Sequence, residues 1–243
     1  MPAIAPTRPE SGVSGGGTGH RSGISTVAAK TVMAVTGAVF AGFVLMHMVG
    51  NLKIYGGQPG FDAYAHWLRT AFMPLLPHEG LLWLLRAVLL LCLVAHLWCG
   101  AIVRLRGRRA RGAVRARTSS MRAWAARSMP LTGLVLLGFL VFHLLDLTAG
   151  SAPAAADGFV AGSAYANVVA SFSRPAAAAV YLVTMLVLAA HLAHGLFSVL
   201  VDLGVGLVGR GRAVATACCL AFALVVALGN VTIPISILTG VVK

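Results

Sequence analysis

The chain has 243 residues, of which 58% are hydrophobic and only 10% are charged, and its net charge is +13. Because a soluble domain carries about a quarter charged residues, this composition excludes a single soluble core and indicates a membrane protein. Nine arginines fall between Arg104 and Arg127, in a segment between two apolar runs, so we expect the positive charge to mark a loop rather than a nucleic-acid partner.

The chain divides into a tail and one transmembrane domain. Residues 1–24 are rich in Pro, Gly and Ser, which predicts a disordered tail, and residues 25–243 form the domain. Five apolar runs have the roughly 20 residues that span a bilayer. The predicted helices are about 27–52, 80–103, 130–149, 175–201 and 213–239. Pro130 and Pro175 suit the first turns of the third and fourth helices.

The distribution of Lys and Arg predicts the orientation. The tail, the second loop and the fourth loop carry most of these cations, whereas the first loop, the third loop and the C-terminus carry few. Cytoplasmic loops are the positive ones. We therefore expect an all-α transmembrane five-helix bundle with a cytoplasmic N-terminus and an external C-terminus.

The first outer loop, residues 53–79, contains an amphipathic pattern. Phe61, Tyr64 and Leu68 follow Pro59 near helical spacing, which predicts a short helix in the membrane interface. The second long outer loop, residues 150–174, has a weaker version of the pattern.

Five of the eight histidines lie inside apolar runs, where ionisable side chains are costly and usually functional. His47, His96, His143 and His191 follow one another at intervals of 49, 47 and 48 residues, each past the midpoint of its helix. Successive helices run in opposite directions. His47 and His143 should therefore form an outer pair and His96 and His191 an inner pair, roughly 10–15 Å apart in depth.

Two facing imidazoles in each layer are the ligands that b-type haem requires, and a helix bundle supplies its apolar slot. The chain has no CxxC or CxxCH motif, which argues against a zinc site and covalently attached haem. A metal-ion site is disfavoured because no carboxylate or thiolate joins either layer. For any single histidine, a hydrogen-bonded helix contact is an equal alternative.

Further residues are candidates for binding the cofactor. Gly50, Gly100 and Gly195 follow histidines by three or four residues, which leaves room for a flat macrocycle or for ordinary helix packing. His194 lies one turn after His191, and we assign it to a propionate or a supporting role. Arg86 and Lys30 are candidates for haem propionates; interface snorkelling and a positive-inside anchor are the alternatives.

The quinone-site candidates lie in the outer half of the predicted bundle. Tyr64, His66 and Trp67 belong to the first outer loop, where interface anchoring explains the aromatic residues equally well. Asp146 lies one turn beyond His143, where it either handles protons or ends its helix in water.

The motifs HMVGNL, GFDAYAHWLR, LVAHLWCG, FLVFHLLDL and HLAHGLFSVLVDLG occur within roughly residues 26–240. In these motifs and their spacing the chain resembles the dihaem cytochrome b membrane anchor of bacterial succinate dehydrogenase, a succinate:menaquinone oxidoreductase. The resemblance implies two b haems, a distal one held by His47 and His143 and a proximal one held by His96 and His191. It also favours His191 over His194 as the ligand.

The resemblance further implies a subunit of the bacterial cytoplasmic membrane that binds a flavoprotein subunit and an iron–sulfur subunit. Electrons from succinate would pass through the haems to menaquinone, which is reduced in or near this chain. The chain has no succinate chemistry of its own, and a higher oligomer of the whole complex is compatible with this assignment. Ala189 stands where some fumarate-reducing relatives carry Glu, which favours succinate oxidation.

Two alternatives remain. One is a dihaem cytochrome b anchor of the nitrate reductase, formate dehydrogenase or fumarate reductase type. One histidine on each of the first four helices favours the succinate dehydrogenase type instead. The other alternative is a transporter or scaffold without haem, which predicts polar or Gly/Pro-broken helices at the midplane.

Overall fold

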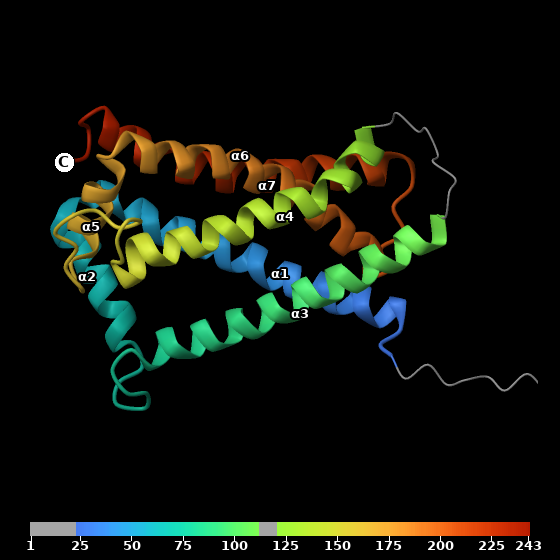
Figure 1. Ribbon diagram of the computed structural model, residues 1–243, viewed down its shortest axis with the longest axis horizontal. Helices are drawn as coiled ribbons and strands as arrows, with labels where there is room; N and C mark the ends of the chain where they lie inside the picture. The colour runs from blue at the N-terminus through green and yellow to red at the C-terminus, as the bar shows by residue number, and fades with distance from the viewer. Residues whose placement is uncertain (1–22, 112–120) are drawn as a thin grey trace, which may run out of the picture.

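The computed structural model describes residues 23–111 and 121–243, and five long helices run side by side in it (Figure 1). They are α1 (Thr26–Asn51), α3 (Gly80–Arg111), α4 (Met121–Leu144), α6 (Pro175–Asp202) and α7 (Gly209–Leu238). Each contains a segment long and apolar enough to cross a membrane, and the described residues include no strand. Helices suit this environment because a lipid-exposed backbone must satisfy its own hydrogen bonds. The prediction of an all-α chain with five spans is confirmed.

Short helices gather at one end of the bundle, together with the C-terminus (Figure 1). They are the 3₁₀ turn η1 (Leu52–Gly56), α2 (Gly57–Thr70), the π-helical turn η2 (Leu145–Ala149) and α5 (Ala164–Phe172). We call this the α2 end. The opposite end holds the start of α1 and the arginines that close α3, and we call it the arginine end. The helix expected after Pro59 is confirmed as α2.

The helix boundaries agree with local signals in two places and differ in two. Ser25 caps α1 by accepting the Ala28 N–H at 3.0 Å, and Pro175 occupies the first turn of α6. Pro130, however, lies inside α4, and α3 continues to Arg111. Much of the expected arginine-rich loop is therefore helical, because arginine is a good helix former and these ends extend past the apolar segment. The expected disordered tail lies outside the described residues except for residues 23 and 24.

The packing order within the bundle is α3, α1, α6 and α4, with α7 against α6 and α1. Small residues allow the close approach that membrane helices use. Ala29, Ala34 and Ala41 of α1 are buried, and Met48 of α1 packs where Gly229 of α7 has no side chain. At the α2 end the core is larger and more aromatic; its buried members are Ile54, Phe61, Tyr165, Phe172, Tyr181, Ile233, Ile237 and Val242.

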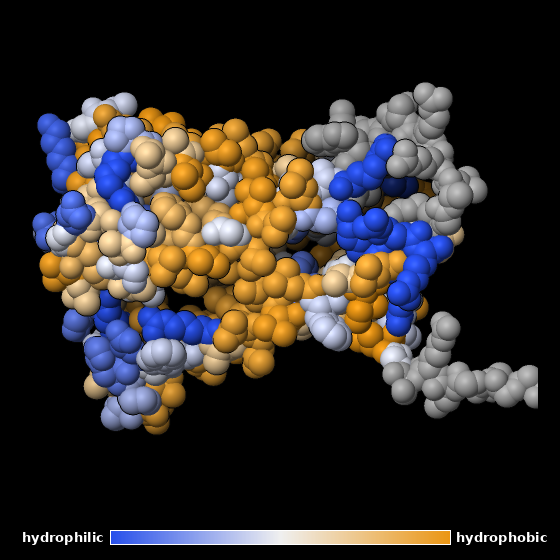
Figure 2. Space-filling model, in the orientation of Figure 1, coloured by the Kyte–Doolittle hydropathy of each residue, from blue (hydrophilic) through white to orange (hydrophobic). Residues whose placement is uncertain are grey.

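Helices α3 and α4 are packed less closely than the other three. None of the most apolar segment of α3 is buried, and only 6% of that of α4. Figure 2 shows openings between α3 and the rest of the bundle and, on the face in view, an apolar surface across the middle of the molecule with hydrophilic residues towards both ends. This surface, together with the five spans, indicates a multi-pass membrane protein.

Candidate functional site

The outer pair of histidines meets across the bundle. The ring centroids of His47, on α1, and His143, on α4, are 5.9 Å apart, and the ring planes are nearly perpendicular at 86°. Each ring stacks on a phenylalanine one turn earlier, at 5.4 Å for Phe43 and 5.8 Å for Phe139. The two histidines that the depth argument paired therefore lie together, each stacked on a phenylalanine of its own helix.

A hydrogen-bonded chain fixes the orientation of His143. Its Nδ1 lies 3.2 Å from Tyr181 Oη, and Tyr181 Oη lies 2.9 Å from Asp146 Oδ2. The tyrosine has one proton, which it donates to the carboxylate, so its oxygen accepts the Nδ1–H of His143. This arrangement leaves Nε2 of His143 unprotonated and available as a metal ligand.

Asp146 is the buried centre of this chain. Its residue is 1% exposed, and its carboxylate accepts hydrogen bonds from Ser171 Oγ at 2.6 Å and Arg174 Nη2 at 2.9 Å besides Tyr181. The π-helical turn η2 carries Asp146, and such turns often occur at functional sites. The alternative that Asp146 ends its helix in water is therefore wrong, because Arg174 and two hydroxyls hold it in the protein interior.

The inner pair has a different kind of partner. Thr36 Oγ1 lies 3.0 Å from His96 Nδ1, and Thr132 Oγ1 lies 2.9 Å from His191 Nδ1. Each threonine hydroxyl donates to a carbonyl of its own helix, at 2.7 Å for Val32 and 3.0 Å for Met129. Each hydroxyl therefore accepts the histidine Nδ1–H, and Nε2 is again the unprotonated nitrogen.

The matching environments come from an internal repeat. Residues 33–47, MAVTGAVFAGFVLMH, align with residues 129–143, MPLTGLVLLGFLVFH, and residues 93–100, LVAHLWCG, align with 188–195, LAAHLAHG. The α1–α3 pair and the α4–α6 pair are thus two copies of one unit. The repeat indicates Thr36 and Thr132, which the histidine spacing alone does not reveal. It also pairs His191 with His96 and His194 with Cys99.

The three predicted glycine gaps differ in how much space adjoins them. A side chain on Gly50 would meet Tyr64 Oη at 2.7 Å, one on Gly100 would meet Met33 Sδ at 3.6 Å, and one on Gly195 would meet Met129 Cε at 3.9 Å. Tyr64 therefore fills the space beside Gly50, whereas a Cβ at Gly100 or Gly195 would make only an ordinary contact with a methionine.

Two other glycines lie beside the inner histidines instead. Added Cβ atoms on Gly37 and Gly133 would lie 3.5 and 3.6 Å from Cε1 of His96 and His191. Both glycines immediately follow the threonines of the repeat. The imidazoles thus lie in van der Waals range of these positions on α1 and α4.

The predicted propionate cations have carboxylate partners in this chain. Lys30 Nζ lies 3.1 Å from Asp202 Oδ1 at the arginine end. Arg86 Nη1 lies 3.7 Å from Glu79 Oε2, and its guanidinium stacks over Trp83 at 4.7 Å. His194 is half-buried on α6, within range of electrostatic interaction with His191.

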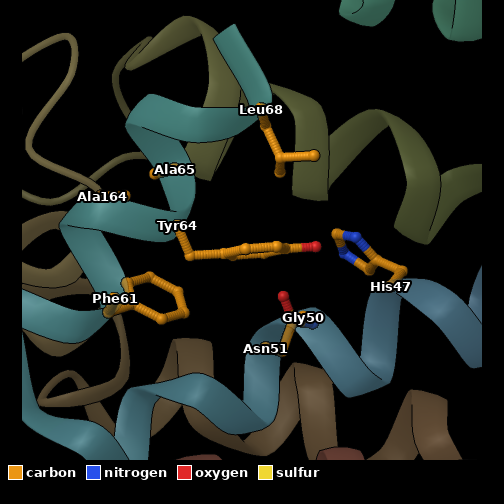
Figure 3. Close-up of a pocket in the computed structure, with 8 residues that line it drawn as sticks. All are labelled: His47, Gly50, Asn51, Phe61, Tyr64, Ala65, Leu68 and Ala164. Atoms are coloured by element: carbon orange, nitrogen blue, oxygen red, sulfur yellow. The ribbon is translucent and has the colours of Figure 1, made fainter. Parts of the chain in front are cut away.

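A small cavity adjoins the outer pair (Figure 3). Its volume is about 130 Å³, and it lies between α1 and α2. Figure 3 shows the Tyr64 hydroxyl pointing towards His47. His66 and Trp67 lie on the exposed face of α2, with Trp67 stacked on Tyr64 at 6.0 Å. The cavity lining is His47, Gly50, Asn51, Phe61, Tyr64, Ala65, Leu68 and Ala164, so Tyr64 is the quinone candidate that reaches it.

The fold and the site together define a multi-pass helical membrane protein in which His47 meets His143, while threonines hold His96 and His191. A family model of the succinate dehydrogenase/fumarate reductase transmembrane subunit matches residues 106–228, about half of the chain. The chain belongs to this family, whose members are membrane anchors of complexes with flavoprotein and iron–sulfur subunits. No curated protein and no solved structure gives a significant match. The matched segment includes His143 and His191, whereas His47 and His96 lie before it in the chain.

Proposed function

We propose that this subunit carries electrons from the iron–sulfur subunit of succinate dehydrogenase through two b haems to a membrane quinone, menaquinone. The observation that carries the proposal is the contact of His47 with His143 across the bundle, beside two further intramembrane histidines, His96 and His191, that are each held by a threonine. The distal haem is assigned to His47 and His143, and the proximal haem to His96 and His191.

The residues present fit bis-histidine ligation. Metal–imidazole bonds of about 2 Å on either side of one ion are compatible with ring centroids 5.9 Å apart. Three of the four histidines have their Nδ1–H engaged by a hydroxyl, which leaves Nε2 as the donor atom. All four side chains remain partly exposed within the loosely packed bundle.

When bound, haem b with two axial histidines supplies one-electron transfer rather than oxygen chemistry. The chain's own residues hold and orient it: Thr36, Thr132 and Tyr181 fix three imidazole rings, and Phe43 and Phe139 stack on the outer two. The apolar helices exclude water around the ligands.

The quinone site is proposed at the cavity between α1 and α2. Tyr64 places a phenol hydroxyl beside His47, where it is suited to donate a hydrogen bond to a quinone carbonyl. Leu68 and Phe61 supply apolar walls. His47 itself lines this cavity, which supports electron delivery at the α2 end.

The proposed orientation of the chain in the membrane follows from the distribution of its Lys and Arg residues. The arginine end is proposed to face the cytoplasm of a bacterium and to bind the two soluble subunits, and the α2 end to face outward. Arg106 is already engaged there with the start of α1, donating to Thr26 Oγ1 at 2.9 Å and Ile24 O at 2.8 Å. Ala189, in place of the Glu of some fumarate-reducing relatives, supports succinate oxidation as the direction.

Haem analysis of the purified complex tests the proposal. A pyridine haemochrome spectrum and a redox titration should give two b haems per chain. Replacing His47 or His143 by Ala should abolish one spectral component, and replacing His96 or His191 the other. His66→Ala, on the exposed face of α2, serves as the control that retains both. A colourless protein, or loss of one shared component from both His47→Ala and His96→Ala, would contradict the assignment.

A further inference from the structure

Among the four proposed haem ligands, His143 is distinguished by the acceptor of its Nδ1–H. The acceptor of His143 is Tyr181, whose own proton goes to the buried Asp146 carboxylate at 2.9 Å. The acceptors of His96 and His191 are threonines whose protons go to neutral backbone carbonyls. Within the described residues, no hydrogen bond to a side chain orients His47.

The carboxylate is held in place from several sides. Ser171 and Tyr181 both donate to Asp146 Oδ2, at 2.6 and 2.9 Å, and Arg174 donates to Oδ1 at 2.9 Å. The side chain of Asp146 is fully buried, whereas that of Arg174 is 33% exposed. The negative group thus lies in the protein interior, one hydrogen bond beyond Tyr181, and its counter-ion Arg174 binds the other carboxylate oxygen and is partly exposed.

The internal repeat shows that this chain of contacts belongs to one copy only. Under the alignment of the two helix pairs, Asp146 corresponds to Gly50 and Tyr181 corresponds to Arg86. In the first copy the phenol of Tyr64, from α2, fills the space over Gly50. The two ligands of the outer pair therefore have equivalent backbone positions but different electrostatic surroundings.

We propose that Asp146, acting through Tyr181, is a positioning residue that makes His143 the more strongly electron-donating ligand of the outer haem and lowers that haem's midpoint potential. An anionic acceptor behind an imidazole N–H increases the basicity of the ligating nitrogen. The oxidised iron is the more positive state, so it gains more from such a ligand than the reduced iron does. This inference rests on the proposed function, since it requires haem at His143.

Redox titration of the purified complex measures the effect. Asp146→Asn retains shape and a hydrogen-bond acceptor but removes the charge. At a fixed ambient potential, the reduced-to-oxidised ratio of the haem component that His143→Ala abolishes should rise about tenfold, which is about 59 mV for a one-electron couple. Tyr181→Phe breaks the chain without changing net charge, and it should shift the same component in the same direction.

The double variant distinguishes a chain of contacts from a general field. If Asp146 acts through Tyr181, then Asp146→Asn in the Tyr181→Phe background adds little, whereas a through-space charge predicts additive shifts. Asp62→Asn is the matched control, because Asp62 is also at the α2 end but accepts from the Tyr165 N–H at 2.9 Å instead. The Asp62→Asn variant should leave the midpoint potentials of both haems unchanged.

Each outcome has one interpretation. Unchanged potentials in both single variants, equal shifts in both haems, or fully additive shifts would overturn the role of Asp146 while leaving the haem assignment intact. If Asp146→Asn does not accumulate, Tyr181→Phe decides, because it removes a single oxygen. A wild-type complex in which His143→Ala abolishes no haem component would instead overturn the proposed function.

Discussion

The phenol ring of Tyr64 lies against Gly50, so closely that a Cβ on Gly50 would be 2.7 Å from Tyr64 Oη and 2.9 Å from Cε1. Gly50 is part of α1, and Tyr64 belongs to α2, which crosses the end of the bundle. The contact thus joins the helix of an outer histidine to the helix that closes the cavity beside it. Lys53 Nζ, 5.2 Å from the centre of the ring, covers Tyr64 as well.

Replacing Gly50 by Ala should displace Tyr64 and damage the quinone site while retaining haem. We expect the quinone KM to rise roughly tenfold, because misplacement of a positioned group by a fraction of an ångström weakens every contact it makes. Steady-state succinate:quinone reductase assays measure this. Gly42→Ala is the control, since a Cβ there meets no atom within 4 Å. An unchanged KM in Gly50→Ala would show that the quinone binds elsewhere.

Replacing Tyr64 by Phe tests the hydroxyl itself. Loss of one hydrogen bond to quinone should lower kcat/KM roughly 3- to 10-fold, which corresponds to about 0.5–1.5 kcal/mol. Succinate oxidation with an artificial electron acceptor should be unaffected, because it bypasses the quinone. His66→Gln, two residues along the same helix but on its exposed face, is the matched control. Equal losses in the two variants would argue against a direct role for the hydroxyl.

The sequence predicts the helices well and their detailed surroundings less well. Hydropathy alone places the five spans to within a few residues except at the end of α3, which continues to Arg111, and at the start of α4, where Met121 rather than Pro130 begins the helix. Proline suits a first turn, but a membrane helix also tolerates it inside. Length and apolar composition therefore predict where the membrane spans lie, whereas a single proline does not define a helix boundary.

The candidate site was predictable as a set of histidines and not as a set of contacts. Depth arguments pair His47 with His143, and the structure brings these two together. Tyr181 and Ser171 were missed because hydroxyls in apolar runs and loops carry no pattern of their own. Their role depends on the π-helical turn that buries Asp146, and no local sequence signal indicated that turn. Only the repeat of TG before each GF(x)₃H segment pointed to the threonines.

Replacing Thr36 or Thr132 by Val should weaken haem binding by the inner pair. Valine has the same shape but cannot accept the histidine Nδ1–H, and loss of such a partner typically costs 10- to 100-fold in metal affinity. Titration of haem into the purified protein stripped of haem, monitored by absorbance, measures this for each component. Thr216→Val is the control, because its exposed hydroxyl donates to the Arg212 carbonyl of its own helix, at 2.9 Å. A loss confined to the component ligated by His47 and His143 would contradict the assignment.

Replacing Gly229 by Ala should loosen the contact between α1 and α7. Met48 lies where the new methyl group would be, and both helices carry buried residues at this contact, so the sulfur has to move. Overpacking of this kind typically costs about 1–3 kcal/mol. Thermal unfolding in detergent, followed by circular dichroism, should show a lower Tm for the variant. Gly211→Ala, on the same helix with open space beside it, should instead leave the Tm equal or slightly higher, because alanine favours helix by up to about 1 kcal/mol over glycine. A Tm for Gly229→Ala that matches Gly211→Ala would mean that α1 and α7 are not in close contact at this position.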